Sequence, residues 1–287
     1  MKVFVTGADG MVGRALVPLL RKRWDVRSTD LPELDVTDAP RVGDAVAAFG
    51  PDVIIHLASI TDVDACERDP EAARLVNAGG TANVAAACRK CGATMLYLST
   101  GMIYNGRKSA PYIEYDAPDP VNAYGRSKYE GELAVRAALE KYYIFNTCWI
   151  FGGGSADRKF VARIIELARS RATLRVVDDT YGSPTYTMDL AGAIDRFLRE
   201  ARSEADYGRY HCVGRGCVNR FELAGEILAA AGIGGCRLEP ASSSEFDLPA
   251  PRPRMEAMAN YSLDLLGFRP MRDWREALRE YIASAGF

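Results

Sequence analysis

The chain has 287 residues, of which 48% are hydrophobic and 26% are charged, and its formal net charge is −2. This composition is ordinary for a globular protein and excludes collagen-like or wholly disordered structure. The slightly acidic balance argues against a nucleic-acid partner, because binding to a phosphate backbone requires a basic surface. No apolar run approaches the roughly 20 residues that a membrane-spanning helix needs, so we expect no membrane partner.

Short apolar segments alternate with longer amphipathic ones along the first half of the chain. We predict strands at 1–6, 26–29, 53–58, 94–99 and 143–149, and helices at 11–22, 41–49, 70–89 and 122–139. Alternation of this kind predicts βαβ units and a parallel sheet with helices on both faces. The predicted fold class is therefore α/β, with a Rossmann-type doubly wound parallel sheet.

The pattern changes after residue 149. We predict helices at 160–168, 188–198, 221–231 and 274–281, a strand at 174–177, and a loop with several prolines at 239–254. We assign residues 1–149 to a dinucleotide-binding domain and residues 150–287 mainly to a smaller C-terminal substrate-binding lobe. Elements near 174–200 are expected to rejoin the first domain.

Targeting and metal signals are weak in this sequence. The N-terminus begins with strand-like residues rather than a charged segment followed by an apolar one, so we expect no signal peptide. The seven cysteines are odd in number and irregularly spaced, which favours reduced thiols and a cytoplasmic location. Cys88 and Cys91 form a Cys-x-x-Cys without a second pair at zinc spacing, and the histidines are His56 and His211. We therefore predict no metal site.

A glycine-rich turn joins the first predicted strand to the first predicted helix, with Gly7, Gly10 and Gly13 in a Gly-x-x-Gly-x-x-Gly pattern. The first glycine permits a tight turn, the second lets the backbone approach a pyrophosphate, and the third lets the helix lie close to the strand. The helix N-terminus at Met11 and Val12 then offers free N–H groups to the phosphates. The turn predicts a dinucleotide cofactor.

The second predicted strand leaves the choice between NAD and NADP open. Asp30 follows it near the offset expected for a carboxylate that binds a ribose 2′-hydroxyl, which favours NAD. Arg14 and Arg27 lie close enough in sequence to bind a 2′-phosphate, so NADP remains an alternative. Asp35 and Val36 fit a position beside the adenine, or equally a polar loop residue and a buried valine.

Tyr124 and Lys128 lie four residues apart on a predicted helix and therefore share one face. An unperturbed tyrosine has a pKa of about 10, and a neighbouring ammonium lowers it. The pair makes a usable acid and base at a carbonyl oxygen, and Lys128 can also bind ribose hydroxyls. Thr100, at the end of a predicted strand, supplies a hydroxyl that can share the same oxygen. We predict Thr100, Tyr124 and Lys128 as the catalytic set.

Together these motifs resemble the extended short-chain dehydrogenases/reductases, and more narrowly the dTDP-4-dehydrorhamnose reductase family. The resemblance covers essentially the whole chain. It is carried by residues 6–13, 56–59, 61–64 with Glu67, 99–100, 122–128, 179–185, 266–268 and 273–278. It implies hydride transfer from a nicotinamide to C4 of a nucleotide-linked 4-keto-6-deoxysugar, with Tyr124 as the proton donor.

The motifs and the resemblance together define two sets of binding residues. The predicted cofactor-binding residues are Gly7, Gly10, Met11, Val12, Asp30, Asp35, Val36, Ala58, Tyr124 and Lys128. The predicted substrate-binding residues are Thr61, Val63, Tyr104, Trp149 and Arg252. For the two aromatic residues of the second set, packing in the core is an equal alternative.

Two segments depart from the family's pattern. Gly101 stands where the family has an aspartate that offers the sugar a polar contact, and Gly101 with Met102 lacks the acid pair of the related dehydratases. Later in the chain, Arg252 and Arg254 keep guanidinium groups that suit a diphosphate, but Glu256 replaces a small hydroxyl residue. These changes are expected to alter the sugar or nucleotide that the protein accepts.

Three rival functions remain open. One is a sugar-nucleotide epimerase of the same superfamily, which would keep its cofactor bound. The second is a non-catalytic, dinucleotide-binding regulatory subunit like the β subunit of methionine adenosyltransferase. The third is a reductase whose carbonyl substrate carries no nucleotide. The sequence does not decide the oligomeric state, for which a homodimer is one option.

Overall fold

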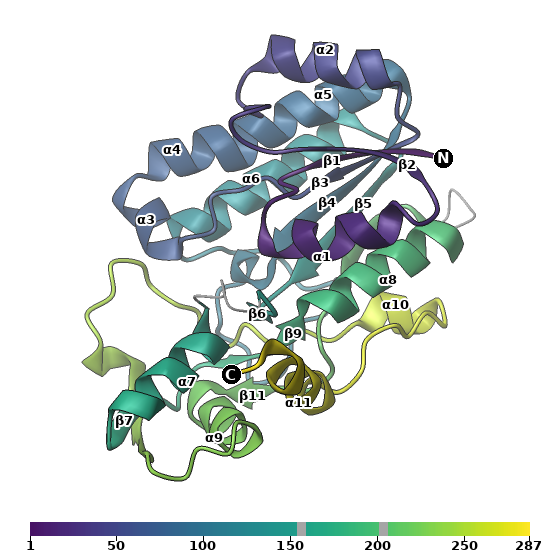
Figure 1. The fold of residues 1–287 in the computed structure, drawn as a ribbon. Coiled ribbons are helices and arrows are strands. Elements are labelled where there is room, and N and C mark those ends of the chain that lie inside the picture. The colour runs from purple at the N-terminus through teal and green to yellow at the C-terminus, as the bar shows by residue number, and fades with distance from the viewer. Residues whose placement is uncertain (154–158, 201–205) are drawn as a thin grey trace.

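A parallel sheet forms the centre of the computed structural model, which describes residues 1–153, 159–200 and 206–287. Within these ranges the sheet has six strands in the order β10-β5-β4-β3-β1-β2 (Figure 1). The strands are β1 Lys2–Thr6, β2 Asp25–Thr29, β3 Val53–His56, β4 Thr94–Thr100, β5 Tyr142–Thr147 and β10 Gly208–His211. The strand order reverses between β1 and β3, so the sheet is doubly wound as predicted.

Helices cover both faces of this sheet. On one face lie α1 Met11–Leu20 and α8 Thr187–Glu200, and on the other lie α2 Ala39–Phe49, α5 Thr81–Cys91 and α6 Ala123–Ala138 (Figure 1). Alternation along β1 shows how one strand serves both layers: Val3 and Val5 pack toward α1, whereas Phe4 packs toward α2. Because both faces are covered, the central strand β3 is buried along its whole length and is mostly apolar, whereas the edge strands β2 and β10 are more polar.

The segment predicted as one helix at 70–89 is instead three consecutive helical pieces. They are α4 Pro70–Arg74, a π-helical turn Leu75–Gly80, and α5. Asn77 lies buried in the π turn, where its Oδ1 accepts hydrogen bonds from Ser59 Oγ at 2.9 Å and from Ile60 N at 2.8 Å. Its amide nitrogen donates to Ser127 Oγ at 3.0 Å. The π turn therefore ties the loop after β3 to α6.

A smaller lobe lies beyond the carboxyl ends of the strands, in the lower half of Figure 1. It contains β6 Ile150–Phe151, α7 Phe160–Ser170, β7 Thr173–Val177, β8 Tyr181–Gly182, β9 Thr185–Tyr186, β11 Val218–Asn219, α9 Arg220–Ala230, β12 Arg237–Ala241 and α11 Trp274–Ala285. Its core is a separate hydrophobic cluster that includes Ile164, Leu223 and Trp274. Two short helices are α3 Val63–Arg68, which packs against α6, and α10 Tyr261–Leu265, which packs against β10.

Some local predictions are wrong. Strand β7 does not rejoin the main sheet but pairs with β12, although α8 from the same stretch packs against α1. Strand β12 occupies the start of the predicted loop at 239–254. The prediction took Pro240 as a sign of a loop. An edge strand tolerates a proline at a position where the missing N–H would face away from the partner strand. Strand β10, which contains His211, pairs with β5 at the edge of the main sheet.

Residues 250–259 form a segment that returns from the smaller lobe to the first domain. Ala250 N donates to Asp64 Oδ1 at 3.2 Å, and Asn122 Nδ2 donates to the carbonyl of Pro251 at 2.9 Å. A parallel bridge then joins Tyr112 to Met258. We call residues 250–259 the return segment. A second parallel bridge, between Tyr181 and Met255, joins it to the smaller lobe, so the return segment connects the two parts.

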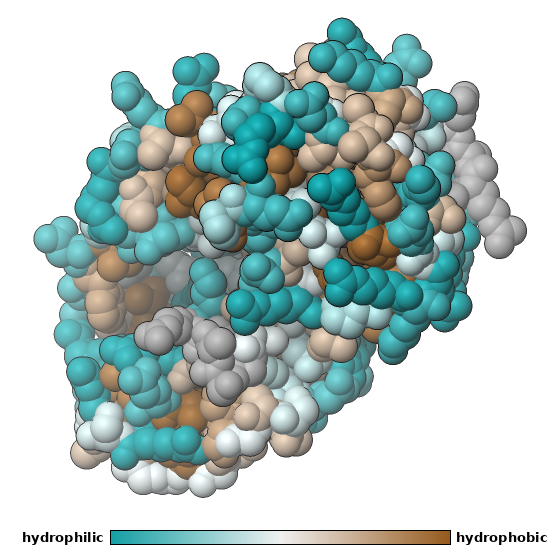
Figure 2. All heavy atoms as spheres, turned by 45° about the horizontal axis from the view of Figure 1, so that its top comes forward, coloured by the Kyte–Doolittle hydropathy of each residue, from teal (hydrophilic) through white to brown (hydrophobic). Residues whose placement is uncertain are grey.

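Figure 2 shows hydrophilic side chains over much of one face, with hydrophobic groups in smaller patches between them. In the part of the chain that the structure describes, no helix is both long and apolar enough to span a membrane. The same ranges hold no group of three or more His, Cys, Asp or Glu side chains arranged for a metal ion. All seven cysteines lie in these ranges and are free.

Candidate active site

A cavity of about 750 Å³ lies between the carboxyl ends of β1 to β5 and the smaller lobe. This size is usual for a small-molecule site, and the edge beside a strand-order reversal is where open α/β sheets bind ligands. The predicted residues that line it are Gly7, Gly10, Met11, Val12, Asp30, Asp35, Val36, Ala58, Thr61, Val63, Thr100, Tyr124, Lys128 and Trp149. Arg220 and Glu256 also line it, so segments from residue 7 to residue 256 meet in one cavity.

The glycine-rich turn forms one end of the cavity and has no room for side chains. Gly7 has a φ of 71°, and a Cβ there would lie 2.4 Å from the backbone nitrogen of Ala58. A Cβ on Gly13 would lie 2.4 Å from the carbonyl oxygen of Ala8. The N-terminus of α1 at Gly10 has no side-chain cap. Its N–H groups therefore border the cavity as a cradle for a phosphate, which fits a dinucleotide.

Asp30 connects this cradle to the end of β2. Its Oδ2 accepts a hydrogen bond from Asp9 N at 2.8 Å, and its Oδ1 accepts one from Leu31 N at 2.8 Å. Each carboxylate oxygen keeps a further lone pair that can accept from a ribose hydroxyl. Arg14 and Arg27, the alternatives for a 2′-phosphate, are not among the residues that line the cavity.

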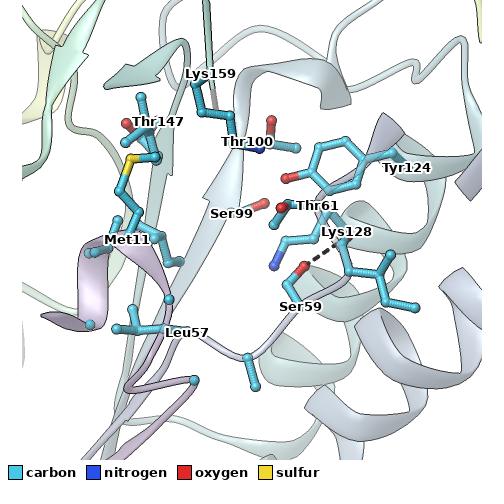
Figure 3. A pocket seen from close by; sticks show the side chains of 18 of the residues that line it. Met11, Leu57, Ser59, Thr61, Ser99, Thr100, Tyr124, Lys128, Thr147 and Lys159 are labelled. Atoms are coloured by element: carbon cyan, nitrogen blue, oxygen red, sulfur yellow. Dashed lines mark hydrogen bonds between the residues drawn. The ribbon is translucent and has the colours of Figure 1, made fainter. Parts of the chain in front are cut away.

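The catalytic candidates come together at the centre of the cavity. Thr100 ends β4, and Tyr124 and Lys128 lie one turn apart on α6. Figure 3 shows the Tyr124 hydroxyl and the Lys128 amine pointing into the same region, beside Thr100. The first turn of α6 is fixed by Asn122, whose Oδ1 accepts from Gly125 N at 2.8 Å. The helix spacing and its cap, both local features of the sequence, therefore place the Tyr124 and Lys128 side chains on the same side of α6.

Burial sets the protonation of these two groups. It raises the pKa of Tyr124, and a hydrogen bond with the Thr100 side chain opposes that rise only partly. It lowers the pKa of Lys128 to about 7, against the opposing charge of Glu132. Lys128 is 3% exposed, and its Nζ lies 4.3 Å from the centre of the Tyr97 ring. Tyr124 is therefore a neutral phenol at neutral pH, the form that donates a proton.

Glu132 lies one further turn along α6, behind Lys128, and sequence reasoning missed it. Its Oε1 accepts from Asn146 Nδ2 at 2.7 Å, and its Oε2 lies 3.7 Å from an Arg209 guanidinium nitrogen. The side chain is fully buried, and burial raises the pKa of its carboxyl group. The four-residue step from Lys128 was the available signal, because it places both side chains on one helix face.

The far end of the cavity holds an aromatic and charged group from several elements. Trp149 has a φ of 47°, and its indole lies so close to Gly182 that a Cβ there would be 2.2 Å away. The Arg220 guanidinium carbon lies 3.5 Å from the centre of the Trp149 ring and 4.6 Å from that of Phe160. Trp149 Nε1 donates to Glu256 Oε2 at 2.9 Å. Trp149, Phe160, Arg220 and Glu256 all line the cavity.

Arg220 was not predicted, and no motif marks it in the sequence. Within the described residues, no carboxylate lies within ion-pair distance of its guanidinium, although the charge of Glu256 acts on it. Burial lowers the pKa of Arg220 to about 10, so the group stays charged at neutral pH. A cation held between two aromatic rings at a cavity wall is suited to an anionic ligand.

The structure does not bring two predicted substrate residues to the cavity. Tyr104 is fully buried, with its hydroxyl 2.8 Å from His211 Nε2 and its ring stacked on Tyr112. Arg252 Nη1 donates to the carbonyl of Ala250 at 2.8 Å, and its Nη2 lies 3.0 Å from Asp64 Oδ1. Neither residue lines the cavity, nor does Arg254.

The parallel sheet, the glycine-rich turn and the cluster of Thr100, Tyr124 and Lys128 define a Rossmann-type protein of the short-chain dehydrogenase/reductase class. More narrowly, the chain belongs to the RmlD substrate binding domain family, whose model matches residues 1–286. It is 37% identical over 285 residues to a dTDP-4-dehydrorhamnose reductase of Mycolicibacterium smegmatis, covering 99% of this chain and 85% of that protein.

Solved structures agree with this membership. A dTDP-4-dehydrorhamnose reductase from Clostridium acetobutylicum is similar at a TM-score of 0.94 and 36% identity, with all of both chains covered. The same enzyme from Bacillus anthracis, solved in complex with NADP, is similar at a TM-score of 0.92 and 35% identity, with 98% of each chain covered. The predicted family and fold class are confirmed.

Proposed function

We propose that this protein reduces the 4-keto group of a nucleotide-linked 6-deoxysugar, with NADPH or NADH as the hydride donor. The observation that carries the proposal is that Thr100, Tyr124 and Lys128 meet in one cavity. The glycine-rich phosphate cradle lies at one end of this cavity, and the Arg220 guanidinium lines its far end. The relatives from M. smegmatis and C. acetobutylicum, both named as dTDP-4-dehydrorhamnose reductases, support the substrate class.

The cofactor site follows from the residues at the β1 and β2 end of the cavity. Gly7, Gly10, Met11 and Val12 would hold the pyrophosphate, Asp30 the adenosine ribose, Asp35 and Val36 the adenine side, and Ala58, Tyr124 and Lys128 the nicotinamide half. When bound, the dinucleotide supplies a hydride. The B. anthracis relative supports NADP, whereas the carboxylate of Asp30 favours a free 2′-hydroxyl, so both dinucleotides remain in the proposal.

Proton transfer belongs to the chain's own side chains. As C4 gains a hydride, its oxygen gains the negative charge of an alkoxide. Tyr124 donates its phenolic proton to that oxygen, and the Thr100 hydroxyl donates a hydrogen bond to it. Protonated Lys128 stabilises the phenolate that remains on Tyr124. The products are the 4-hydroxy sugar and an oxidised dinucleotide, so the charges balance once the phenol regains a proton from water.

The assay that tests this function follows NADPH and NADH oxidation with enzymatically generated dTDP-4-keto-6-deoxy-L-mannose. We expect turnover that depends on the sugar. A dinucleotide that stays bound through purification, with sugar interconversion and no net oxidation, would instead indicate the epimerase. Tight dinucleotide binding without turnover of any sugar would indicate the regulatory role.

The two arginines make separable predictions for a nucleotide-linked substrate. Arg220→Ala is expected to raise KM for the sugar nucleotide by roughly 10- to 100-fold, because it removes a charged hydrogen-bond donor from the wall of the cavity. Arg252→Ala is expected to change KM by less than about threefold, because Asp64 and the Ala250 carbonyl already engage its guanidinium. Steady-state kinetics of both variants decide this, and the opposite order of effects would return the phosphate-binding role to Arg252.

Three broader expectations stay proposals. We propose that residues 1–149 bind the dinucleotide and that residues 150–287 mainly bind the substrate, with α8 and β10 packed on the first part. A cytoplasmic location is supported by the seven free cysteines, which suit a reducing compartment. The homodimer stays a prediction.

A further inference from the structure

The side chain of Glu256 occupies the space beside Gly101. A Cβ on Gly101 would lie 3.1 Å from Glu256 Cγ and 3.0 Å from the Glu256 carbonyl oxygen. Gly101 directly follows Thr100, at the start of a 3₁₀ turn. The missing side chain at 101 thus makes room for a carboxylate that arrives from the return segment, 155 positions later in the chain.

Contacts on several sides hold this carboxylate in place. Glu256 is 5% exposed, and its Oε2 accepts from Trp149 Nε1 at 2.9 Å. The Arg220 cation, stacked on the same indole, lowers the pKa of Glu256 and partly offsets the rise that burial causes. The charge of Glu256 also reaches Tyr124, whose pKa it raises. The Glu256 carboxylate therefore interacts with Trp149 and Arg220 at the far end of the cavity and also with Tyr124.

One oxygen of the carboxylate remains for a ligand. Among the described residues, Oε1 accepts no hydrogen bond, and Glu256 lines the cavity. An ionised carboxylate only accepts hydrogen bonds, so the matching group on a ligand is a donor such as a hydroxyl. Glu256 packs against Gly101, the residue after Thr100, and its charge acts on Tyr124. If Tyr124 and Thr100 hold the carbonyl oxygen, this position points to a hydroxyl on the adjacent carbon as the donor.

We propose that Glu256 is a specificity-determining residue that accepts a hydrogen bond from the sugar hydroxyl next to the carbonyl carbon. This inference rests on the proposed function, and it names the feature of the sugar that the cavity selects. Without that hydroxyl, the carboxylate would be buried by the substrate with Oε1 unpaired, which disfavours the analogue. In a 4-keto sugar the hydroxyl in question is the one on C3.

The test compares dTDP-4-keto-6-deoxy-L-mannose with its 3-deoxy and 2-deoxy analogues. For the wild-type protein, kcat/KM is expected to be roughly 10- to 100-fold lower for the 3-deoxy analogue than for the parent sugar. Glu256→Ala should bring this ratio close to one, and Glu256→Gln, which keeps an acceptor oxygen, should give an intermediate ratio. The 2-deoxy ratio should be the same in all variants.

Two additional variants separate recognition from structural damage. Glu114→Gln removes another mostly buried carboxylate that does not line the cavity, and it should keep the wild-type ratios. Gly101→Asp in the Glu256→Ala background returns a carboxylate to the same space from the β4 side and should restore part of the discrimination. NADPH dissociation constants, measured by fluorescence, confirm that the cofactor end is intact in each variant.

The outcomes are distinct. If Glu256→Ala lowers kcat/KM equally for the parent and the 3-deoxy sugar, Glu256 only positions Trp149 and the inference is wrong. The same holds if the wild-type protein does not distinguish the two sugars. If the wild-type protein turns over none of the three sugars while it binds NADPH, the proposed function itself fails and the inference falls with it.

Discussion

Replacement of Tyr124 with phenylalanine is expected to lower kcat by about 10²- to 10⁴-fold, the usual contribution of a general acid. The substitution removes one oxygen and leaves the ring, so the packing around α6 is preserved. Because burial holds the Tyr124 phenol in its neutral form, the wild-type residue carries its proton before the reaction begins. Only the transition state and the alkoxide gain from that proton, so KM and NADPH binding should change little.

Steady-state kinetics with dTDP-4-keto-6-deoxy-L-mannose and NADPH titration measure this effect. Tyr112→Phe is the matched control, since Tyr112 is buried, does not line the cavity and donates to Asn105 Oδ1. That control should keep kcat within about threefold of wild type, a margin typical of changes away from the chemistry. A Tyr124→Phe variant with nearly full kcat would move the proton donor to another group, with Thr100 next in position.

Replacement of Lys128 with methionine is expected to change activity and stability in opposite directions. Loss of the ammonium should lower kcat by about 10²-fold or more, because the positive charge that stabilises the Tyr124 phenolate is then missing. The same change removes a buried cation from the folded state. Burial lowers the folded-state pKa of Lys128 from 10.5 to about 7. Below pH 7 the resulting penalty is on the order of 5 kcal/mol.

The pH window of this penalty follows from the two pKa values. Between about pH 7 and pH 10.5 the unfolded chain binds a proton at Lys128 that the folded chain does not. Stability of the cofactor-free protein should therefore rise with pH through that window, and the Lys128→Met variant should lose the rise. Urea denaturation at pH 6 and pH 9 measures it. If the Lys128→Met variant is less stable than wild type at pH 6, the predicted penalty is wrong. The attraction of Glu132 would then fully offset the cost of burying the Lys128 charge.

Local patterns predicted the parts of the molecule that are built locally. The glycine-rich turn depends on residues that are neighbours in sequence, and Tyr124 and Lys128 share a helix face by spacing alone. The alternation of apolar strands and amphipathic helices likewise predicted the doubly wound sheet. The π-helical turn escaped detection, because its apolar and small residues also fit an ordinary helix.

Residues placed by the tertiary fold could not be found in the same way. Tyr104 follows Thr100 closely in sequence, but the 3₁₀ turn at Gly101–Ile103 directs it into the core against His211. Arg220 reaches the cavity because β11 and α9 are anchored in the smaller lobe, which no local pattern indicates. The sequence showed only that Glu256 departs from the family's pattern. Its contact with Gly101 could not be predicted, because the two residues are far apart in the chain.

The return segment also determines the order in which the site is completed during synthesis. Strands β1 to β5 and the residues of the catalytic set are all present once residue 147 has left the ribosome. Glu256 and the contacts of Ala250 and Pro251 with the first domain require nearly the whole chain of 287 residues. A nascent chain that stops before residue 250 would hold the phosphate cradle and the catalytic groups without a finished sugar pocket. If Glu256 selects the sugar as proposed, this selection is the last property that the growing protein acquires.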